Sequence, residues 1–540
     1  MTLKDMLRLV TPPVFIHLAM RLRGNRPIGA CGLSGDYHKM NSFRVPRQGP
    51  GLQGKVESAQ VLFFNYRHWI ILTCLLLLGS VRLYNLGMKS LWLDEAVIWQ
   101  IAHVGPLSAI VESNAARNSA PPLYALLISP IASWTNSEAI LRLLSCIAGI
   151  IAVPAMYYLL RCFLTEIAAL AGASLLALSP TQVAYAQELR EYSLTVLLTI
   201  LILFFFLRFL FRPKAIYAVG LIVFSLIGLF TQYGIALLLV GLALTAVSAM
   251  GFWKEMRQRQ LLLGLGAFLG SSLFAAIAVF FLALRYQIHI GGFAGGSYLA
   301  EGYWDGSFSS LGEMAISNTF NLLQFASHQS IVGLMLLFIL WGVLTLCKWR
   351  TREGYLVLLM LVLPFSIVFI AALLRLYPYI GARQDIFLTV GLYALTAVGL
   401  EELFKARRVV FILTMGIIVI VFTYSSWRKL RAPSSEEMRP LIPSLCSQIK
   451  DSDIIFVDDR ASPAFEFYRS SCSSLSASRV VFGEIPSAPS KGRVWFVLSH
   501  VSLEERDDFL QNAQSFYNTS LREFIHFDGA WLYFINSQAN

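Results

Sequence analysis

Long apolar runs constrain this chain more than any other feature. Many are about 20 residues long and nearly free of charge, which is the length an α-helix needs to cross the hydrocarbon core of a bilayer. Strands of a membrane barrel would instead alternate in polarity over about 10 residues. The sequence therefore predicts an all-α polytopic membrane protein with about eleven transmembrane helices. The runs are 68–87, 139–160, 166–184, 192–211, 215–233, 234–252, 261–284, 330–347, 354–374, 385–404 and 408–425.

Composition excludes a soluble multidomain enzyme. Only 14% of the 540 residues are charged and 56% are hydrophobic, whereas soluble domains carry about 25% charged residues. The net charge of +11 would suggest a nucleic-acid partner in a soluble protein. In a membrane protein the same sum arises from Lys and Arg in cytoplasmic loops, so no nucleic acid is expected.

Charge asymmetry between loops predicts the orientation. Residues 1–67 hold ten Lys and Arg against three acids and are interpreted as a basic cytoplasmic tail. Basic clusters recur in alternate loops, for example at 348–352 and 405–408, while the loop 286–328 contains no Lys or Arg. The positive-inside rule then places the C-terminal segment outside. The expected domains are the tail 1–67, a membrane domain 68–425 and an extracytoplasmic domain 426–540.

The first outer loop is expected to carry two short helices within 95–134. Pro121–Trp134 is apolar but contains Pro121, Pro122 and Pro130, so it is too short and too interrupted to span. We assign it as an interfacial or re-entrant helix, and 95–110 as a second surface helix.

Residues beyond 425 change character and predict a small α/β domain with an accessory role, either capping the membrane part or binding the acceptor. Its Cys446 and Cys472 could form a disulfide if the domain is exported, but spacing alone leaves the pairing open. No Gly-rich phosphate motif follows a strand. Strands are predicted at 453–459, 479–482, 493–498 and 530–535, and helices at 434–450 and 502–513.

Three groups of polar residues are expected at the outer membrane face. Asp94 and Glu95 follow the first span and could deprotonate a hydroxyl, hold a cation or cap the next helix. Glu188, Arg190 and Glu191 form a tight turn that could equally be a solvated hinge. Arg383 lies at the outer start of the tenth run, just before residue 385, and could bind a phosphate or reach toward lipid headgroups. Their convergence on one face favours a functional site.

Several motifs occur in the order found in a known enzyme family. Leu91-Trp-Leu-Asp-Glu-Ala96, Pro121-Pro-Leu-Tyr124, Glu138-Ala-Ile-Leu-Arg-Leu143, Leu178-Ser-Pro180 and Tyr185-Ala-Gln-Glu-Leu-Arg-Glu-Tyr192 stand in that order. Together they resemble bacterial members of glycosyltransferase family 39. This family belongs to the GT-C superfamily with the protein O-mannosyltransferases and the lipid A aminoarabinose transferases.

The resemblance implies a polyprenyl-phosphate sugar donor, an outward-facing site and inversion at the sugar. It further implies a bacterial inner-membrane location and an acceptor that is a protein, a lipid or a cell-envelope glycan. Asp94, with Glu95 beside it, corresponds to the catalytic carboxylates, and Arg383 and Arg190 to donor-phosphate ligands. Glu188, Tyr192 and Tyr124 correspond to substrate-binding residues. No cofactor is assigned, and a divalent cation held by Asp94 or Glu95 is left open.

This chain departs from the family at two positions, because Ala120 and Gln232 stand where members often have His. Two other functions remain as alternatives. One is a transporter or flippase of lipid-linked sugars, although no internal repeat of the kind common in transporters is evident. The other is an oligosaccharide ligase with a lipid-pyrophosphate donor.

Overall fold

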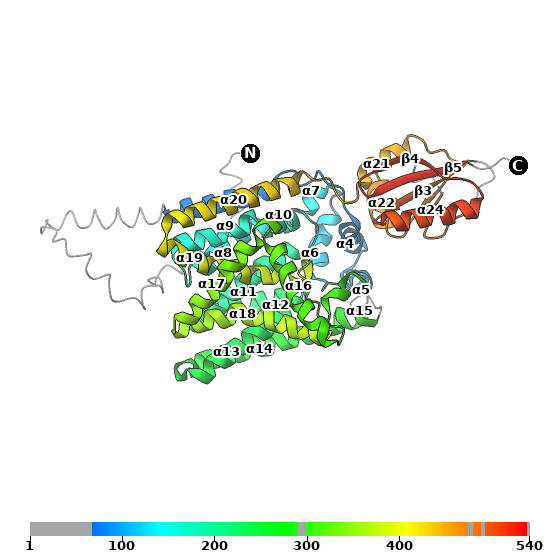
Figure 1. Ribbon diagram of the computed structural model, residues 1–540. Coiled ribbons are helices and arrows are strands. Elements are labelled where there is room, and N and C mark those ends of the chain that lie inside the picture. The colour runs from blue at the N-terminus through cyan, green and yellow to red at the C-terminus, as the bar shows by residue number, and fades with distance from the viewer. Residues whose placement is uncertain (1–66, 290–296, 473–474, 476–478, 488–491, 537–540) are drawn as a thin grey trace, which may run out of the picture.

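The structure is a computed structural model that describes residues 67–540 except 290–296, 473–474, 476–478, 488–491 and 537–540. The predicted tail lies outside the described residues apart from Arg67. Figure 1 shows a helical bundle with a small sheet domain at one end. The predicted class, a mostly helical membrane protein with a C-terminal α/β domain, is confirmed.

The bundle consists of helices that coincide with the predicted apolar runs. A helix over 67–79 and the 3₁₀ turn η4 Ser80–Leu83 come first. The others are α8 Leu143–Leu160, α9 Glu166–Leu178, α11 Tyr192–Phe211, α12 Ala215–Leu229, α13 Gly234–Phe252, α14 Arg259–Val279, α17 Val332–Lys348, α18 Arg352–Leu373, α19 Thr389–Ala406 and α20 Arg408–Arg431. Within the described ranges, eight helices are long and apolar enough to cross a membrane. Helices α9 and α12 are shorter than that limit.

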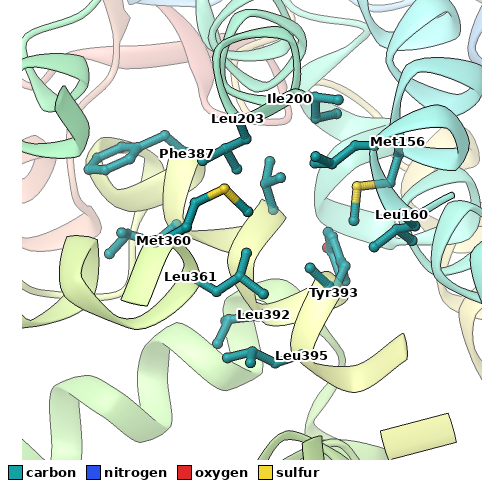
Figure 2. Close-up of a cluster of buried hydrophobic side chains, with 14 of the residues drawn as sticks. Met156, Leu160, Ile200, Leu203, Met360, Leu361, Phe387, Leu392, Tyr393 and Leu395 are labelled. Carbon is teal, nitrogen blue, oxygen red and sulfur yellow. The ribbon is translucent and has the colours of Figure 1, made fainter. Parts of the chain in front are cut away.

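Helix α19 is the centre of the bundle. Of its most apolar segment 94% is buried, whereas the corresponding share for α20 is 28%. Figure 2 shows part of the core, where Met156 and Leu160 of α8 and Ile200 of α11 face Tyr393 of α19. Small residues let α17 and α19 approach closely, because a Cβ at Gly342 would lie 2.2 Å from the Leu395 carbonyl oxygen. Close packing of this kind is typical of membrane helices.

Short helices lie toward the end of the bundle next to the sheet domain (Figure 1). They are α4 Leu93–His103, α5 Leu107–Arg117, α6 Leu123–Ala132, α7 Glu138–Leu141 and α15 Arg285–His289, with η6 Phe280–Leu284 leading into α15. The membrane domain also contains α10 Pro180–Tyr185 and the 19-residue α16 Phe308–Ala326. The single surface helix predicted for 95–110 is wrong, because Gly105, with φ of 133°, and Pro106 separate α4 from α5. Helix α16 lies within 286–328, where the sequence predicts a loop.

The C-terminal domain is a five-stranded mixed sheet with helices. Its strands are β1 Ile454–Val457, β2 Arg479–Phe482, β3 Arg493–Ser499, β4 Arg522–Phe527 and β5 Ala530–Asn536, and its helices α21 Met438–Cys446, α22 Ser462–Arg469 and α24 Leu503–Tyr517. The strand order is β2-β1-β3-β5-β4. Strand β1 runs parallel to β2 and β3, and β5 pairs antiparallel with β3 and β4.

Sequence reasoning missed β4 and α22. Strand β4 lies at the sheet edge and is largely exposed, so it lacks the apolar pattern that indicates a strand. The Asp528-Gly529 turn that joins it to β5 was the available signal. The domain also contains a Cys446–Cys472 disulfide with its Cα atoms 6.2 Å apart, which resolves the pairing that the spacing left open.

Candidate active site

Asp94 lies between two arginines that come from distant parts of the chain. It stands in the first turn of α4, and its Oδ2 is 2.5 Å from Arg383 Nη1 and 3.6 Å from Arg190 Nη1. Burial by itself would raise the pKa of Asp94, but Arg190 and Arg383 outweigh that effect and lower it. The side chain remains 23% exposed, so an ionised carboxylate held by two cations faces an accessible space.

A tight loop before the 3₁₀ helix η9 Arg383–Leu388 sets the position of Arg383. The Asp385 carboxylate accepts hydrogen bonds from the backbone N–H groups of Ile380 and Gly381 at 3.0 and 2.9 Å. Gly381 has φ of 72°, and a Cβ there would lie 2.2 Å from the Leu322 backbone nitrogen of α16. Only glycine fits this conformation and this contact, so α16 and Asp385 together fix the loop that presents Arg383.

Arg190 is held in the turn between α10 and α11. Its guanidinium lies 3.3 Å from the Glu191 carboxylate and donates to the Tyr192 hydroxyl at 3.2 Å. Its backbone carbonyl accepts from the Ser145 hydroxyl, which also bonds the buried Tyr124 hydroxyl, both at 2.6 Å. Tyr192 therefore contacts Arg190 directly. Tyr124 is 1% exposed and supports the turn through the Ser145 hydroxyl.

Glu95 lies in a separate, closed site. It is 1% exposed, and its carboxylate pairs with the buried Arg142 at 2.6 Å. The backbone N–H of Leu189 donates to Glu95 at 2.6 Å, and that of Trp92 at 3.4 Å. The adjacent carboxylates therefore do not act on one ligand. Glu95 ties α4 to α8 and to the turn before Arg190, while Asp94 faces the arginines.

Glu188 is the second carboxyl beside the arginines. Its Oε2 atom is buried and accepts no hydrogen bond. Burial, and then the charge of Glu95, raise the pKa of Glu188 to about 8, although Arg190 and Arg383 oppose the shift. A carboxyl with this pKa is largely protonated at neutral pH and can donate a hydrogen bond.

The sheet domain contacts the segment before Asp94 through residues that the sequence analysis did not single out. The Glu436 carboxylate accepts from the Leu93 backbone N–H at the start of α4, at 2.8 Å. The Leu91 N–H donates to the Tyr468 hydroxyl at 2.7 Å, and Ser90 bonds Glu437 at 2.6 Å. These contacts hold both ends of the segment that precedes Asp94. The Ser434-Ser-Glu-Glu437 run was the only signal in the sequence.

The two departures from the family pattern differ, because the Gln232 side chain has a structural role here, whereas at Ala120 the backbone makes the contact. Gln232 donates to the Gln384 carbonyl at 3.0 Å and thereby supports the loop that carries Arg383. The Ala120 carbonyl accepts from Asn114 Nδ2 at 2.8 Å, which joins α5 to the start of α6. Among the residues that the structure describes, no three His, Cys, Asp or Glu side chains form a group suited to a metal ion.

Comparison with known proteins defines the class. Residues 119–282 match the family model described as dolichyl-phosphate-mannose-protein mannosyltransferase. The match includes Glu188 and Arg190 but neither Asp94 nor Arg383. With the fold, it indicates a membrane glycosyltransferase of the GT-C type.

Solved structures share this fold at low sequence identity. ArnT from Cupriavidus metallidurans bound to undecaprenyl phosphate aligns with a TM-score of 0.53 and 11% identity, over 86% of this chain and 97% of that one. Its apo structure aligns with a TM-score of 0.52 and 12% identity, over 89% of this chain and 98% of that one. A third structure is the oligosaccharyltransferase AglB from Archaeoglobus fulgidus in complex with an inhibitory peptide and a dolichol-phosphate. It aligns with a TM-score of 0.52 and 11% identity, over 88% of this chain and 75% of that one. No protein of curated function matches the sequence.

Proposed function

We propose that this protein transfers a sugar from a polyprenyl-phosphate donor to an acceptor on the outer face of the membrane, with inversion at the sugar. Two structures that share its fold hold undecaprenyl phosphate and dolichol-phosphate, which are lipids of this class. The matched family is described by a dolichyl-phosphate donor. The acceptor is a protein, a lipid or a cell-envelope glycan.

The single observation that carries the proposal is the convergence of Arg190 and Arg383 on Asp94. A donor phosphodiester has one negative charge, as does a carboxylate, and guanidinium groups bind phosphate oxygens well. The donor phosphate therefore replaces Asp94 between the two arginines. Once their charges are shared with phosphate, the pKa of Asp94 rises and the carboxylate becomes a stronger base. Donor binding thus prepares the base for the transfer.

The transfer is a single displacement. An acceptor hydroxyl oxygen forms a bond to the anomeric carbon while the bond from that carbon to the phosphate oxygen breaks. Asp94 takes the proton of the hydroxyl as general base. Polyprenyl phosphate leaves with one additional negative charge, which Arg190 and Arg383 stabilise in a partly dehydrated site. Attack opposite the leaving group inverts the anomeric configuration.

Glu188 is assigned to binding the donor sugar. Tyr192 is assigned to holding the Arg190 side chain in position. The buried Oε2 of Glu188 has no hydrogen-bond partner among the described residues. We assign to it a sugar hydroxyl that reaches it when the donor binds, because the protonated carboxyl both donates and accepts. Tyr192 keeps its contact with Arg190. Glu95 and Tyr124, both buried, support the fold of the site rather than touch substrate. A divalent cation, if required, would be held by Asp94 without Glu95, because Arg142 occupies that carboxylate.

We assign the site and the sheet domain to the extracytoplasmic side of a bacterial inner membrane. The disulfide Cys446–Cys472 supports this location, since disulfides persist in oxidising compartments. The basic clusters that flank the other ends of the bundle helices agree with a cytoplasmic position there.

The test uses purified protein in lipid nanodiscs with a panel of undecaprenyl-phosphate sugars and release of undecaprenyl phosphate as the readout. One donor is expected to be consumed by the wild type and not by Asp94→Asn. Asp508→Asn, an exposed acid on α24, is the matched control. Sugar lipid that crosses the bilayer without consumption would instead establish a transporter, and consumption of only pyrophosphate-linked donors a ligase.

A further inference from the structure

A polar cleft of about 460 Å³ opens where the sheet domain meets the first outer loop. It is lined by Trp92, Glu436, Arg460, His500, Ser502 and Glu505. Trp92 is two residues before Asp94, and its ring lies 5.5 Å from the Arg383 guanidinium. The cleft therefore begins at the site where the proposed transfer takes place.

The cleft lies at the point of the sheet where ligands bind most often in α/β folds. The chain leaves β1 toward β2 on one side and then returns to β3 on the other side of β1. Loops after two parallel strands diverge at such a switch point and leave a crevice at their carboxyl ends. Arg460 follows β1, and His500 and Ser502 follow β3, so all three occupy these loops. His500 has φ of 57°, a conformation that non-glycine residues adopt mainly where function or a tight turn requires it.

The basic side chains of the cleft each pair with a carboxylate. Arg460 Nη1 pairs with Glu505 at 2.9 Å, and His500 Nδ1 with Glu436 at 2.5 Å. The side chains of Arg460, His500 and Glu505 remain 39, 41 and 51% exposed, which leaves donors and acceptors free to bind a ligand. A cleft built for a phosphate or a nucleic acid would have an excess of positive charge. Balanced carboxylates and guanidinium instead fit an uncharged ligand with many hydroxyls.

An aromatic platform adjoins these polar groups. The Trp92 ring lies 6.5 Å from the His500 ring at an angle of 29°. A flat aromatic face beside paired donors and acceptors suits a sugar ring, because its C–H faces are apolar and its hydroxyls are both donors and acceptors. The Glu436 carboxylate joins this cleft to the Leu93 N–H at the start of α4, one residue before the candidate base.

We propose that this cleft binds a neutral saccharide, and that the acceptor is therefore a glycan whose hydroxyl is presented to Asp94 by the sheet domain. The role as acceptor site rests on the proposed function, whereas binding of the saccharide does not. The accessory domain is in this view the part of the enzyme that selects the acceptor.

The first experiment measures binding without donor. Saturation-transfer NMR on the full protein in nanodiscs compares the neutral mannotetraose and chitotetraose with the anionic trigalacturonate. We expect transfer to at least one neutral glycan, and loss of that signal in Arg460→Ala and in Glu505→Gln. Glutamine preserves the helix cap that Glu505 forms with Ser502, so folding is retained. Arg522→Ala, an exposed arginine on β4, is the control and should bind normally.

The second experiment measures transfer once a donor is known. Arg460→Ala should raise the KM for the neutral glycan at least tenfold and leave the KM for the donor within twofold. Absence of signal from both neutral glycans, preference for trigalacturonate, or equal binding by Arg460→Ala would overturn the saccharide site. Normal glycan binding without consumption of any donor would instead reject the proposed function and keep the binding site.

Discussion

Asp94 and Glu95 are adjacent in the chain but lie in two regions with opposite properties. Around Asp94 the carboxylate is partly exposed and two arginines approach from distant elements. Around Glu95 the carboxylate and Arg142 are 1 and 2% exposed, and further hydrogen bonds close the site. Successive helix positions differ by about 100° in direction. The Asp94 carboxylate therefore points toward the accessible space beside the two arginines, and the Glu95 carboxylate points into the protein. An acidic pair in a sequence need not act as a pair.

Replacing Asp94 should have the largest effect. Asp94→Asn removes the candidate base but keeps the size of the side chain, so the rate of transfer should fall by about 10²- to 10⁴-fold. The melting temperature should fall less than in Glu95→Gln, because the Asp94 side chain is 23% exposed and solvent screens its ion pairs. Single-turnover transfer and thermal unfolding of the same sample measure both. A large loss of stability would remove the contrast with Glu95.

Replacing Glu95 should instead destabilise the protein. Glu95→Gln leaves Arg142 buried without its charge partner, and breaking such a pair costs about 3–5 kcal/mol. The thermal unfolding transition in detergent should shift clearly downward. Glu138→Gln is the matched control, because its partner Arg439 is 38% exposed and its loss should be small. Normal stability of Glu95→Gln with abolished catalysis would reassign Glu95 to the chemistry.

Replacing Arg383 should weaken donor binding. Arg383→Lys retains the charge but not the paired donors of the guanidinium. The donor KM should rise about 10-fold, because one charge-assisted hydrogen bond is lost. Titration of activity against donor concentration measures it. An unchanged KM with a lower kcat would mean that Arg383 acts only on the leaving group.

The smallest expected effect is a pH dependence from Glu188. Its pKa of about 8 means that the carboxyl is mostly protonated below that value and loses its proton above it. Donor affinity should therefore decline as the pH rises through about 8, by a few-fold. Glu188→Gln resembles the protonated form and should remove this dependence. A decline that persists in the glutamine variant would assign the titration to another group.

Much of the fold could be predicted, because apolar length and strand patterns are local. The prediction succeeded for the bundle helices, where runs from 139 onward coincide with helices. It failed at 95–110, where Gly105 and Pro106 divide the helix, and at β4, whose exposed edge carries no apolar pattern. The motifs with Asp94, Arg190 and Arg383 indicated a site at one face, and the structure brings these three residues together.

A helical membrane protein can be predicted from the amino-acid sequence alone, because burial in lipid requires long apolar runs that are visible residue by residue. The polar residues near the helix ends can be located in the same way. Which of them meet depends on the folded structure. Arg383 reaches Asp94 across 289 positions, Arg142 removes Glu95 from the site, and the sheet domain adds Glu436 and His500. Such contacts depend on how the helices pack, and no local pattern in the sequence encodes them.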